Sequence, residues 1–213
     1  MNSTIAIFSK KCYTIYMEKV TKKRVVIFDC FGVIIKKDVS MVWLKENLDD
    51  ATISEIRKKY YPDADGGKIS GRQLCKILSS YSSWEASDIE KYFHSLVEID
   101  EKVLDLIKRV KKNNYVVMLS NCFSGFLDSV IESYELEKLF DKVIVSCICH
   151  MVKPNKDIYQ HALSFFDGFN GAVMIDDNLV NLEGARNAGI ENVILFTSAR
   201  QAEEELKKMG VEL

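Results

Sequence analysis

The sequence has only two prolines among 213 residues, so it is not a proline-rich chain. It also has no apolar stretch of roughly 18 residues, the length that crosses a bilayer, so it shows no membrane-spanning segment. The formal net charge is −2, so no excess of one sign gives an electrostatic reason to bind nucleic acid. The composition, 47% hydrophobic and 28% charged, excludes a disordered, collagen-like or coiled-coil chain. We therefore expect a globular protein without nucleic-acid or membrane partners.

The six cysteines are scattered and form no dense pattern of pairs. A chain of this length buries about 70% of its unfolded surface and folds without disulfides. We therefore expect free thiols and a cytoplasmic protein. Cys147, Cys149 and His150 suggest a metal site, but a structural zinc usually needs a second pair of ligands, which the sequence does not show. Residues 1–22 place their positive charge after the apolar run, unlike a signal peptide, and are expected to be an N-terminal extension.

Five short apolar runs rich in β-branched residues predict buried strands, at 24–28, 115–119, 142–146, 171–175 and 192–196. Helical patterns lie between them, at 102–112, 123–134, 156–166 and 179–188. Strands that are apolar on both faces and alternate with helices are typical of a parallel sheet covered on both sides. The sequence therefore predicts an α/β fold, with a Rossmann-like, doubly wound core.

The segment between the first two predicted strands is different, because it contains no convincing strand. Its apolar spacing predicts several helices, and the stretch from Pro62 to Gly67, with Asp63 and Asp65, predicts a turn between them. We expect an extension over 1–22, an α/β core over 23–36 and 110–213, and a helical cap over 37–109. Several aromatic residues could line a pocket that faces the cap: Phe31, Trp43, Tyr60, Tyr81 and Trp84. For each of them, filling the hydrophobic core is the simpler role.

Polar residues follow several predicted strands, at the edge where ligands of parallel α/β sheets bind. Asp29 follows the first strand, and Asp176 and Asp177 follow the fourth. One such aspartate is usually a turn or cap residue, so the coincidence of several is the signal. Grouped carboxylates repel one another without a cation, and oxygen ligands suit Mg²⁺.

Three further residues would complement such an acidic cluster. Ser120 and Asn121 follow the second predicted strand, and Lys153 precedes a helix. They would supply hydrogen-bond donors and a positive charge for phosphoryl oxygens. The pattern therefore favours phosphoryl transfer over chemistry on a neutral substrate.

Four stretches, in order, resemble the motifs of the haloacid dehalogenase (HAD) superfamily: 28–34, 119–121, 153–159 and 175–189. The steps from Asp29 to Ser120, on to Lys153 and on to Asp177 are 91, 33 and 24 residues. The resemblance covers the chain from residue 24 to its end. It is closest to the branch that contains glucose-1-phosphate-type phosphatases and the N-terminal phosphatase domain of soluble epoxide hydrolases. The long gap after the first motif resembles the family's inserted helical cap.

The resemblance implies a Mg²⁺-dependent phosphatase that acts on a small phosphorylated metabolite. The particular branch that the motifs resemble suggests that this metabolite is a sugar phosphate. It implies that Asp29 is the nucleophile and forms an aspartyl-phosphate. The groups it assigns to the phosphoryl moiety are the Ser120 hydroxyl, the Asn121 backbone amide and the Lys153 ammonium. The groups it assigns to Mg²⁺ are Asp29, the backbone carbonyl of Phe31 and Asp177, with Asp176 beside the ion.

One departure from the family pattern affects the expected chemistry. Most family phosphatases have a second acid two residues after the nucleophile, where this chain has Phe31. Phenylalanine transfers no proton, and general acid–base help is worth roughly 10²–10⁴ in rate. Members of the resembling branch lack this acid too. His150 is one candidate proton donor, although a lone histidine is more often a loop residue.

Two alternatives therefore stay open. One is a HAD-type dehalogenase, which attacks carbon without a metal. The other is a degenerate HAD-fold binding protein, for which Phe31 is the best argument. The sequence leaves the oligomeric state open between a monomer and a homodimer.

Overall fold

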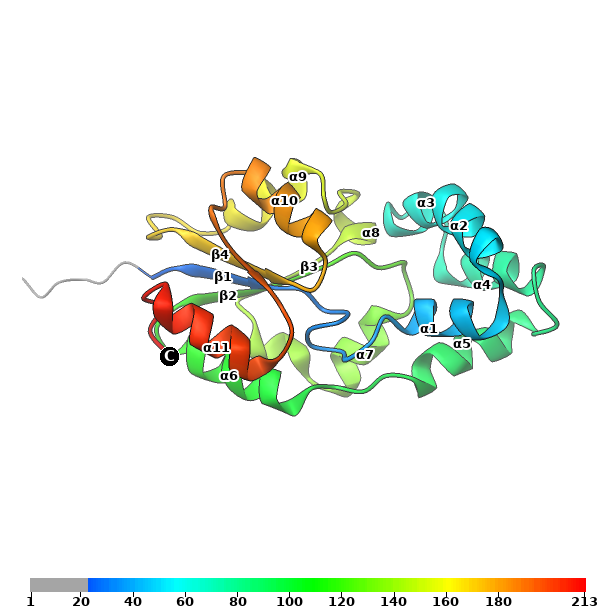
Figure 1. Cartoon of the computed structure of the whole chain (residues 1–213), viewed down its shortest axis with the longest axis horizontal. Helices are drawn as coiled ribbons and strands as arrows, with labels where there is room; N and C mark the ends of the chain where they lie inside the picture. Colours follow the sequence, from blue (N-terminus) through cyan, green and yellow to red (C-terminus); the bar gives the residue numbers. More distant parts are fainter. Residues whose placement is uncertain (1–22) are drawn as a thin grey trace, which may run out of the picture.

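A computed structural model describes residues 23–213, and Figure 1 shows its arrangement. The extension expected over residues 1–22 lies outside the described residues. Five parallel strands form one sheet in the order β3-β2-β1-β4-β5. Each forms at one of the five predicted runs, to within one residue at either end, so the predicted α/β fold is confirmed. The strands are β1 (Val25–Phe28), β2 (Tyr115–Ser120), β3 (Lys142–Val145), β4 (Ala172–Asp176) and β5 (Asn192–Leu195).

Alternate residues of the strands pack on opposite faces of the sheet, as the two-residue period of a strand requires. Val25 and Ile27 of β1 belong to one buried cluster, which includes residues of α9 and α10. Val26 and Phe28 belong to the other, with residues of α6 and α11. Helices therefore cover both faces (Figure 1). The helices of this part are α6 (Glu101–Lys111), α7 (Leu127–Ser133), η1 (Leu136–Leu139), α8 (Ser146–Cys149), α9 (Lys156–Leu163), α10 (Leu179–Asn187) and α11 (Ala199–Lys208).

A bundle of helices is inserted between β1 and β2, where the sequence predicts the cap, and it lies beyond the carboxyl edge of the sheet (Figure 1). The turn predicted over Pro62 to Gly67 forms only at Gly66 and Gly67, because a short helix runs through the residues before them. Pro62 lies in the first turn of that helix, where no backbone N–H donor is needed. The helices of the insertion are α1 (Val39–Asn47), α2 (Asp50–Lys59), α3 (Tyr61–Asp65), α4 (Gly71–Ser79) and α5 (Ala86–Ser95).

The insertion leaves and rejoins the core through two neighbouring segments. The Lys36 N–H donates to the Glu98 carbonyl at 2.9 Å, and the Asp100 N–H donates to the Ile34 carbonyl at 2.8 Å. After this crossing, α6 packs against β2 and α11. We therefore place α6 with the core, and the division of the chain into cap and core stays a proposal.

Within residues 23–213, none of the helices is both long and apolar enough to cross a membrane.

Candidate active site

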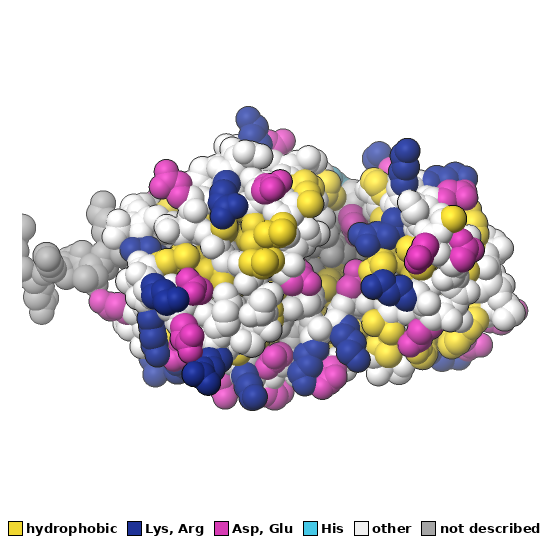
Figure 2. Space-filling view, viewed as in Figure 1, with side chains coloured by type: hydrophobic (Ala, Val, Ile, Leu, Met, Phe, Trp, Pro, Cys, Tyr) yellow, Lys and Arg dark blue, Asp and Glu magenta, His cyan; other side chains and the backbone are white. Residues whose placement is uncertain are grey.

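The carboxyl ends of the central strands meet beneath the inserted helices. Phe28 of β1 pairs in register with Met118 of β2 and Ile175 of β4, so the residues that follow these strands reach one edge. A cavity of about 930 Å³ opens there, and Asp29 and Asp177 line it. Figure 2 shows the groove between the two parts of the molecule, with acidic side chains at its edges.

Lys153 connects two of the predicted acids. Its Nζ lies 2.6 Å from Asp29 Oδ1 and 2.8 Å from Asp176 Oδ2, and all three side chains are buried. Burial raises the pKa of Asp29, the charge of Lys153 opposes that shift, and the charge of Asp176 adds to it. Burial alone would lower the pKa of Lys153, but the two carboxylates outweigh it and raise the pKa. Lys153 is therefore a cation at neutral pH.

The two oxygens of Asp29 have different surroundings. Oδ1 accepts a hydrogen bond from the Cys30 backbone N–H at 2.6 Å, in addition to its contact with Lys153. Oδ2 accepts no hydrogen bond from any group in residues 23–213. One carboxylate oxygen is thus fixed by two donors, and the other is available for attack or for a metal ion.

Asp176 has donors on both oxygens. Oδ1 accepts from the Asn178 backbone N–H at 2.9 Å, and the Asn181 amide lies 3.0 and 3.1 Å from Oδ1 and Oδ2. The Tyr159 hydroxyl donates to the Asn181 carbonyl at 2.7 Å and so fixes the first turn of α10, directly after the loop that carries Asp176. Asp176 therefore holds Lys153 and the loop in place, and its negative charge adds to the site.

Asp177 lies over Gly32, in the loop after β1. A Cβ atom on Gly32 would be 2.1 Å from Asp177 Oδ2, and Gly32 has φ +81°, which glycine adopts without strain. Partial burial raises the pKa of Asp177, and the charge of Asp176 adds to this shift. The glycine of the first motif thus makes room for the acid of the fourth.

These acids fit a divalent cation. One ligand atom from each of Asp29, Asp176 and Asp177 can be chosen so that all three lie within 4.8 Å of one another. Three carboxylates so close together repel one another unless positive charge joins them, and hard oxygen donors suit Mg²⁺. The backbone carbonyl of Phe31, predicted as a further ligand, accepts no hydrogen bond within the part of the chain that the structure describes. The predicted acidic cluster is therefore present, and Asp29 Oδ2 and the Phe31 carbonyl oxygen accept no hydrogen bond from the described residues, whereas both oxygens of Asp176 do.

Ser120 and Asn121 lie at the same edge but make internal contacts. The buried Ser120 hydroxyl donates to the Asn121 carbonyl at 3.4 Å, and Ser120 does not line the cavity. The Asn121 side chain exchanges two hydrogen bonds of 2.9 Å with the backbone of Lys153. This pair fixes the position of Lys153. The predicted contacts of Ser120 and of the Asn121 amide with a phosphoryl group stay predictions.

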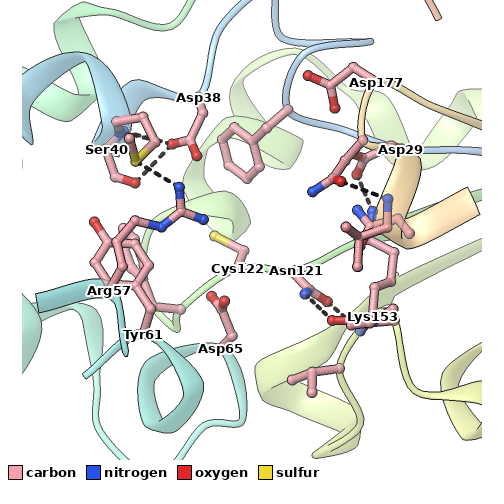
Figure 3. Close-up of a pocket in the computed structure, with 18 of the residues that line it drawn as sticks. Asp29, Asp38, Ser40, Arg57, Tyr61, Asp65, Asn121, Cys122, Lys153 and Asp177 are labelled. Carbon is pink, nitrogen blue, oxygen red and sulfur yellow. Dashed lines mark hydrogen bonds and ion pairs between the residues drawn. The ribbon is translucent and has the colours of Figure 1, made fainter. Parts of the chain in front are cut away.

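The inserted helices form the opposite wall of the cavity (Figure 3), and the charged residues that line it from this side are Asp38, Lys45, Arg57 and Asp65. Arg57 Nη1 lies 3.1 Å from Met41 Sδ, and its guanidinium lies 5.9 Å from the centre of the Tyr61 ring. Sequence reasoning missed these residues because no motif marks them.

The aromatic residues proposed for a pocket have mixed locations. Phe31 lines the cavity and stacks on Phe126, with 6.1 Å between ring centres. Trp43 is fully buried among the helices of the insertion, edge-on to Trp84 and Phe93, so the core-filling interpretation is the right one for it.

His150 lies outside the cavity. Its ring is exposed, and its Nδ1 lies 2.9 Å from the Gly66 carbonyl, which can only accept, so Nδ1 is the donor. It therefore connects the core to the inserted helices, and the hypothesis that it donates a proton in the site has no support. The hypothesis of a metal site at Cys147 and Cys149 has no support either. Within residues 23–213, the group of side chains that could hold a metal ion together is Asp29, Asp176 and Asp177.

The fold and the site define a class of protein: a capped α/β enzyme whose acidic residues and one lysine lie at the carboxyl edge of a parallel sheet. A family model described as haloacid dehalogenase-like hydrolase matches residues 23–189. The chain belongs to this family.

Solved structures have the same fold. A predicted HAD-like hydrolase from Porphyromonas gingivalis is 21% identical, with a TM-score of 0.70, over 90% of this chain and 100% of that one. A HAD family enzyme from Bacteroides thetaiotaomicron, in complex with magnesium and inorganic phosphate, is 19% identical, with a TM-score of 0.65, over 82% and 94%. A dehalogenase is 16% identical, with a TM-score of 0.60, over 85% and 96%.

Proposed function

We propose that this HAD-family hydrolase is a Mg²⁺-dependent phosphatase that cleaves a phosphate monoester of a small metabolite through an aspartyl-phosphate. The observation that carries the proposal is the position of Lys153, 2.6 Å from Asp29, beside the three clustered acids. A site with one cation and three carboxylates suits a bound divalent ion and an anionic phosphoryl group. The branch that the motifs resemble suggests a sugar phosphate as the substrate.

In this proposal Asp29, the Phe31 carbonyl and Asp177 hold Mg²⁺, and Asp176 lies beside it. When bound, Mg²⁺ would neutralise charge on the phosphoryl oxygens and orient the group. The magnesium and phosphate complex of the Bacteroides thetaiotaomicron enzyme supports this choice of ion and ligand.

The residues of the chain then divide the remaining work. Asp29 attacks phosphorus with one of its carboxylate oxygens, while Lys153 and the Cys30 N–H orient the carboxylate through Oδ1. Lys153 also offsets the negative charge of the transferred group. Ser120 and the Asn121 amide bind phosphoryl oxygens, and Asn181 holds Asp176 against Lys153.

Metal dependence separates the proposal from its two alternatives. We would measure hydrolysis of p-nitrophenyl phosphate and of a set of phosphorylated metabolites with Mg²⁺, with EDTA, and with Asp29→Asn as the control. The proposal predicts activity that needs both Mg²⁺ and Asp29. Halide release from haloacids that persists in EDTA would instead indicate a dehalogenase. No turnover of either substrate class would indicate a binding protein.

The expectations of a cytoplasmic location, of a monomer or homodimer, and of no nucleic-acid or membrane partner stay predictions. The five cysteines in the described part of the chain are unpaired, in line with a reducing compartment.

A further inference from the structure

Asp65, the last residue of α3, brings a carboxylate into the active-site cavity. It is half-buried and lines the same cavity as Asp29 and Lys153. Figure 3 shows its side chain projecting from the inserted helices toward Cys122 and Asn121. No group in residues 23–213 makes a hydrogen bond or an ion pair with it. Its carboxylate oxygens are not among the buried unpartnered atoms of residues 23–213, so they are open to the cavity and to a molecule bound there.

The chain directly after Asp65 is fixed to the core. The Gly66 carbonyl accepts the hydrogen bond from His150, and Gly67 has φ +76°. A Cβ atom on Gly67 would lie 2.3 Å from the Cys147 carbonyl oxygen, so the two backbones meet closely. Four residues later, the Gly71 N–H donates to the Ser124 carbonyl at 3.1 Å. Asp65 is thus held against the part of the core that supplies Asn121 and Lys153.

A second acid of this wall, Asp38, is occupied. Its Oδ1 accepts hydrogen bonds from the Ser40 N–H, the Ser40 hydroxyl and the Met41 N–H, which cap the start of α1. Phe31, at the position of the family's usual acid, has no proton to give. Among the acids that line the cavity from the inserted helices, Asp65 is therefore the one whose carboxyl group has no structural hydrogen bond within the described chain.

We propose that the Asp65 carboxyl group transfers the proton in the phosphatase reaction, the task for which Phe31 has no group; this inference rests on the function proposed above. In the first step an Asp29 oxygen bonds to phosphorus, and the bond from phosphorus to the leaving oxygen breaks. The electron pair stays on that oxygen, which takes the proton of Asp65 and departs as an alcohol. In the second step water attacks the aspartyl-phosphate and gives a proton to Asp65, and Asp29 and inorganic phosphate are released.

The electrostatic surroundings of Asp65 suit this exchange. Burial raises its pKa to about 6, the charge of Asp38 adds to the shift, and Arg57 and Lys153 oppose it. A carboxyl group with a pKa near the working pH is able both to give and to take a proton. The charged and titratable groups that face this part of the insertion are Asp38, Arg57, Tyr61, Cys122, Cys147, His150 and Lys153.

The dependence of rate on the leaving group tests the inference. p-Nitrophenolate departs without a proton, whereas an alkoxide from glycerol 3-phosphate needs one. We expect Asp65→Asn to lower kcat/KM for glycerol 3-phosphate by about 10²–10⁴-fold, and for p-nitrophenyl phosphate by less than about tenfold. We also expect the variant to accumulate the aspartyl-phosphate from p-nitrophenyl phosphate, because water is no longer deprotonated. With glycerol 3-phosphate, the fall of kcat/KM above about pH 6 in the wild type should vanish in the variant.

Asp63→Asn is the matched control, because Asp63 is an acid of the same helix that pairs with Lys68 at 2.8 Å and does not line the cavity, so its change should leave the ratio of kcat/KM between the two substrates unaltered. Equal losses for both substrates in Asp65→Asn, or no loss, would overturn the inference. Thermal unfolding and Mg²⁺ binding would confirm that the variant folds, and Asp65→Glu, which keeps a carboxyl group, should retain the wild-type ratio between the two substrates. A wild-type protein that hydrolyses neither substrate would refute the proposed phosphatase itself, which is a distinguishable result.

Discussion

The Lys153 ammonium lies 2.6 Å from the Asp29 carboxylate, and less than a tenth of either side chain is exposed. Asp176 lies on the other side of the same ammonium, at 2.8 Å. One buried cation therefore serves two buried anions. Removing the ammonium would therefore affect both the proposed nucleophile and the stability of the fold.

Lys153→Met should lower both stability and activity. Removing one partner of a buried ion pair leaves uncompensated charge, so we expect the free energy of unfolding to fall by about 3–5 kcal/mol. We expect kcat to fall by about 10²–10³-fold, as for the loss of an oxyanion donor. Urea unfolding and steady-state kinetics would measure the two effects.

Lys45→Met is the control for this change, because Lys45 also lines the cavity but is exposed. We expect its effect on stability to stay within about 0.5 kcal/mol. The double variant Lys153→Met with Asp29→Asn should regain part of the lost stability, because one of the two stranded charges is then gone. No recovery would show that the loss comes from packing rather than charge.

Gly32→Ala should weaken Mg²⁺ binding by displacing Asp177. The added Cβ would lie 2.1 Å from Asp177 Oδ2, so that carboxylate has to move. We expect a loss of Mg²⁺ affinity of about 10–100-fold, the range found when a partner of a metal ligand is changed. Isothermal titration calorimetry would measure it.

Gly168→Ala separates the contact from the backbone strain in that experiment. Gly168 also has a positive φ, +63°, but a Cβ there would meet nothing within 4 Å. Both variants should lose about 1–2 kcal/mol of stability from the left-handed backbone. Equal Mg²⁺ affinities in the two variants would contradict the proposed dependence of the metal site on Gly32.

Asp65→Asn should stabilise the protein at neutral pH. Burial raises the folded-state pKa of Asp65 from 3.8 to about 6, so the folded state binds this proton more tightly than the unfolded state. The protonated Asp65 carboxyl group contributes its full share to the free energy of unfolding below about pH 4, and this contribution is lost as the pH rises through about 6. Urea unfolding should therefore show a gain for the variant on the order of 1–3 kcal/mol at pH 8, and a smaller gain at pH 5. A gain that is independent of pH would contradict this explanation.

The strands were predictable because each is a short, buried, β-branched run, and their bounds differ from prediction by at most one residue. The order of the strands in the sheet could not be predicted, because buried parallel strands have the same composition whatever their order. The polar ends of β1 and β4 could be assigned to one site because parallel strands bring their carboxyl ends to a common edge. That reasoning located Asp29 and Asp177 correctly in one cavity.

The wall formed by the inserted helices could not be predicted. Asp65 stands in a stretch with the composition of a turn, Pro62 to Gly67, and local propensity alone gives its acids no other role. Its position in the cavity depends on long-range contacts of Gly66 and Gly67 with His150 and Cys147. Contacts between residues 80 or more positions apart leave no local pattern in a single sequence.

Trapping the covalent intermediate tests the central claim most directly. The protein would be mixed with Mg²⁺ and p-nitrophenyl phosphate, quenched in acid, reduced with borohydride and digested, and the peptides sequenced by mass spectrometry. The account predicts that Asp29 alone is modified, and that Asp29→Asn yields no modified peptide. Active protein without a modified aspartate, or with the modification on another residue, would contradict it.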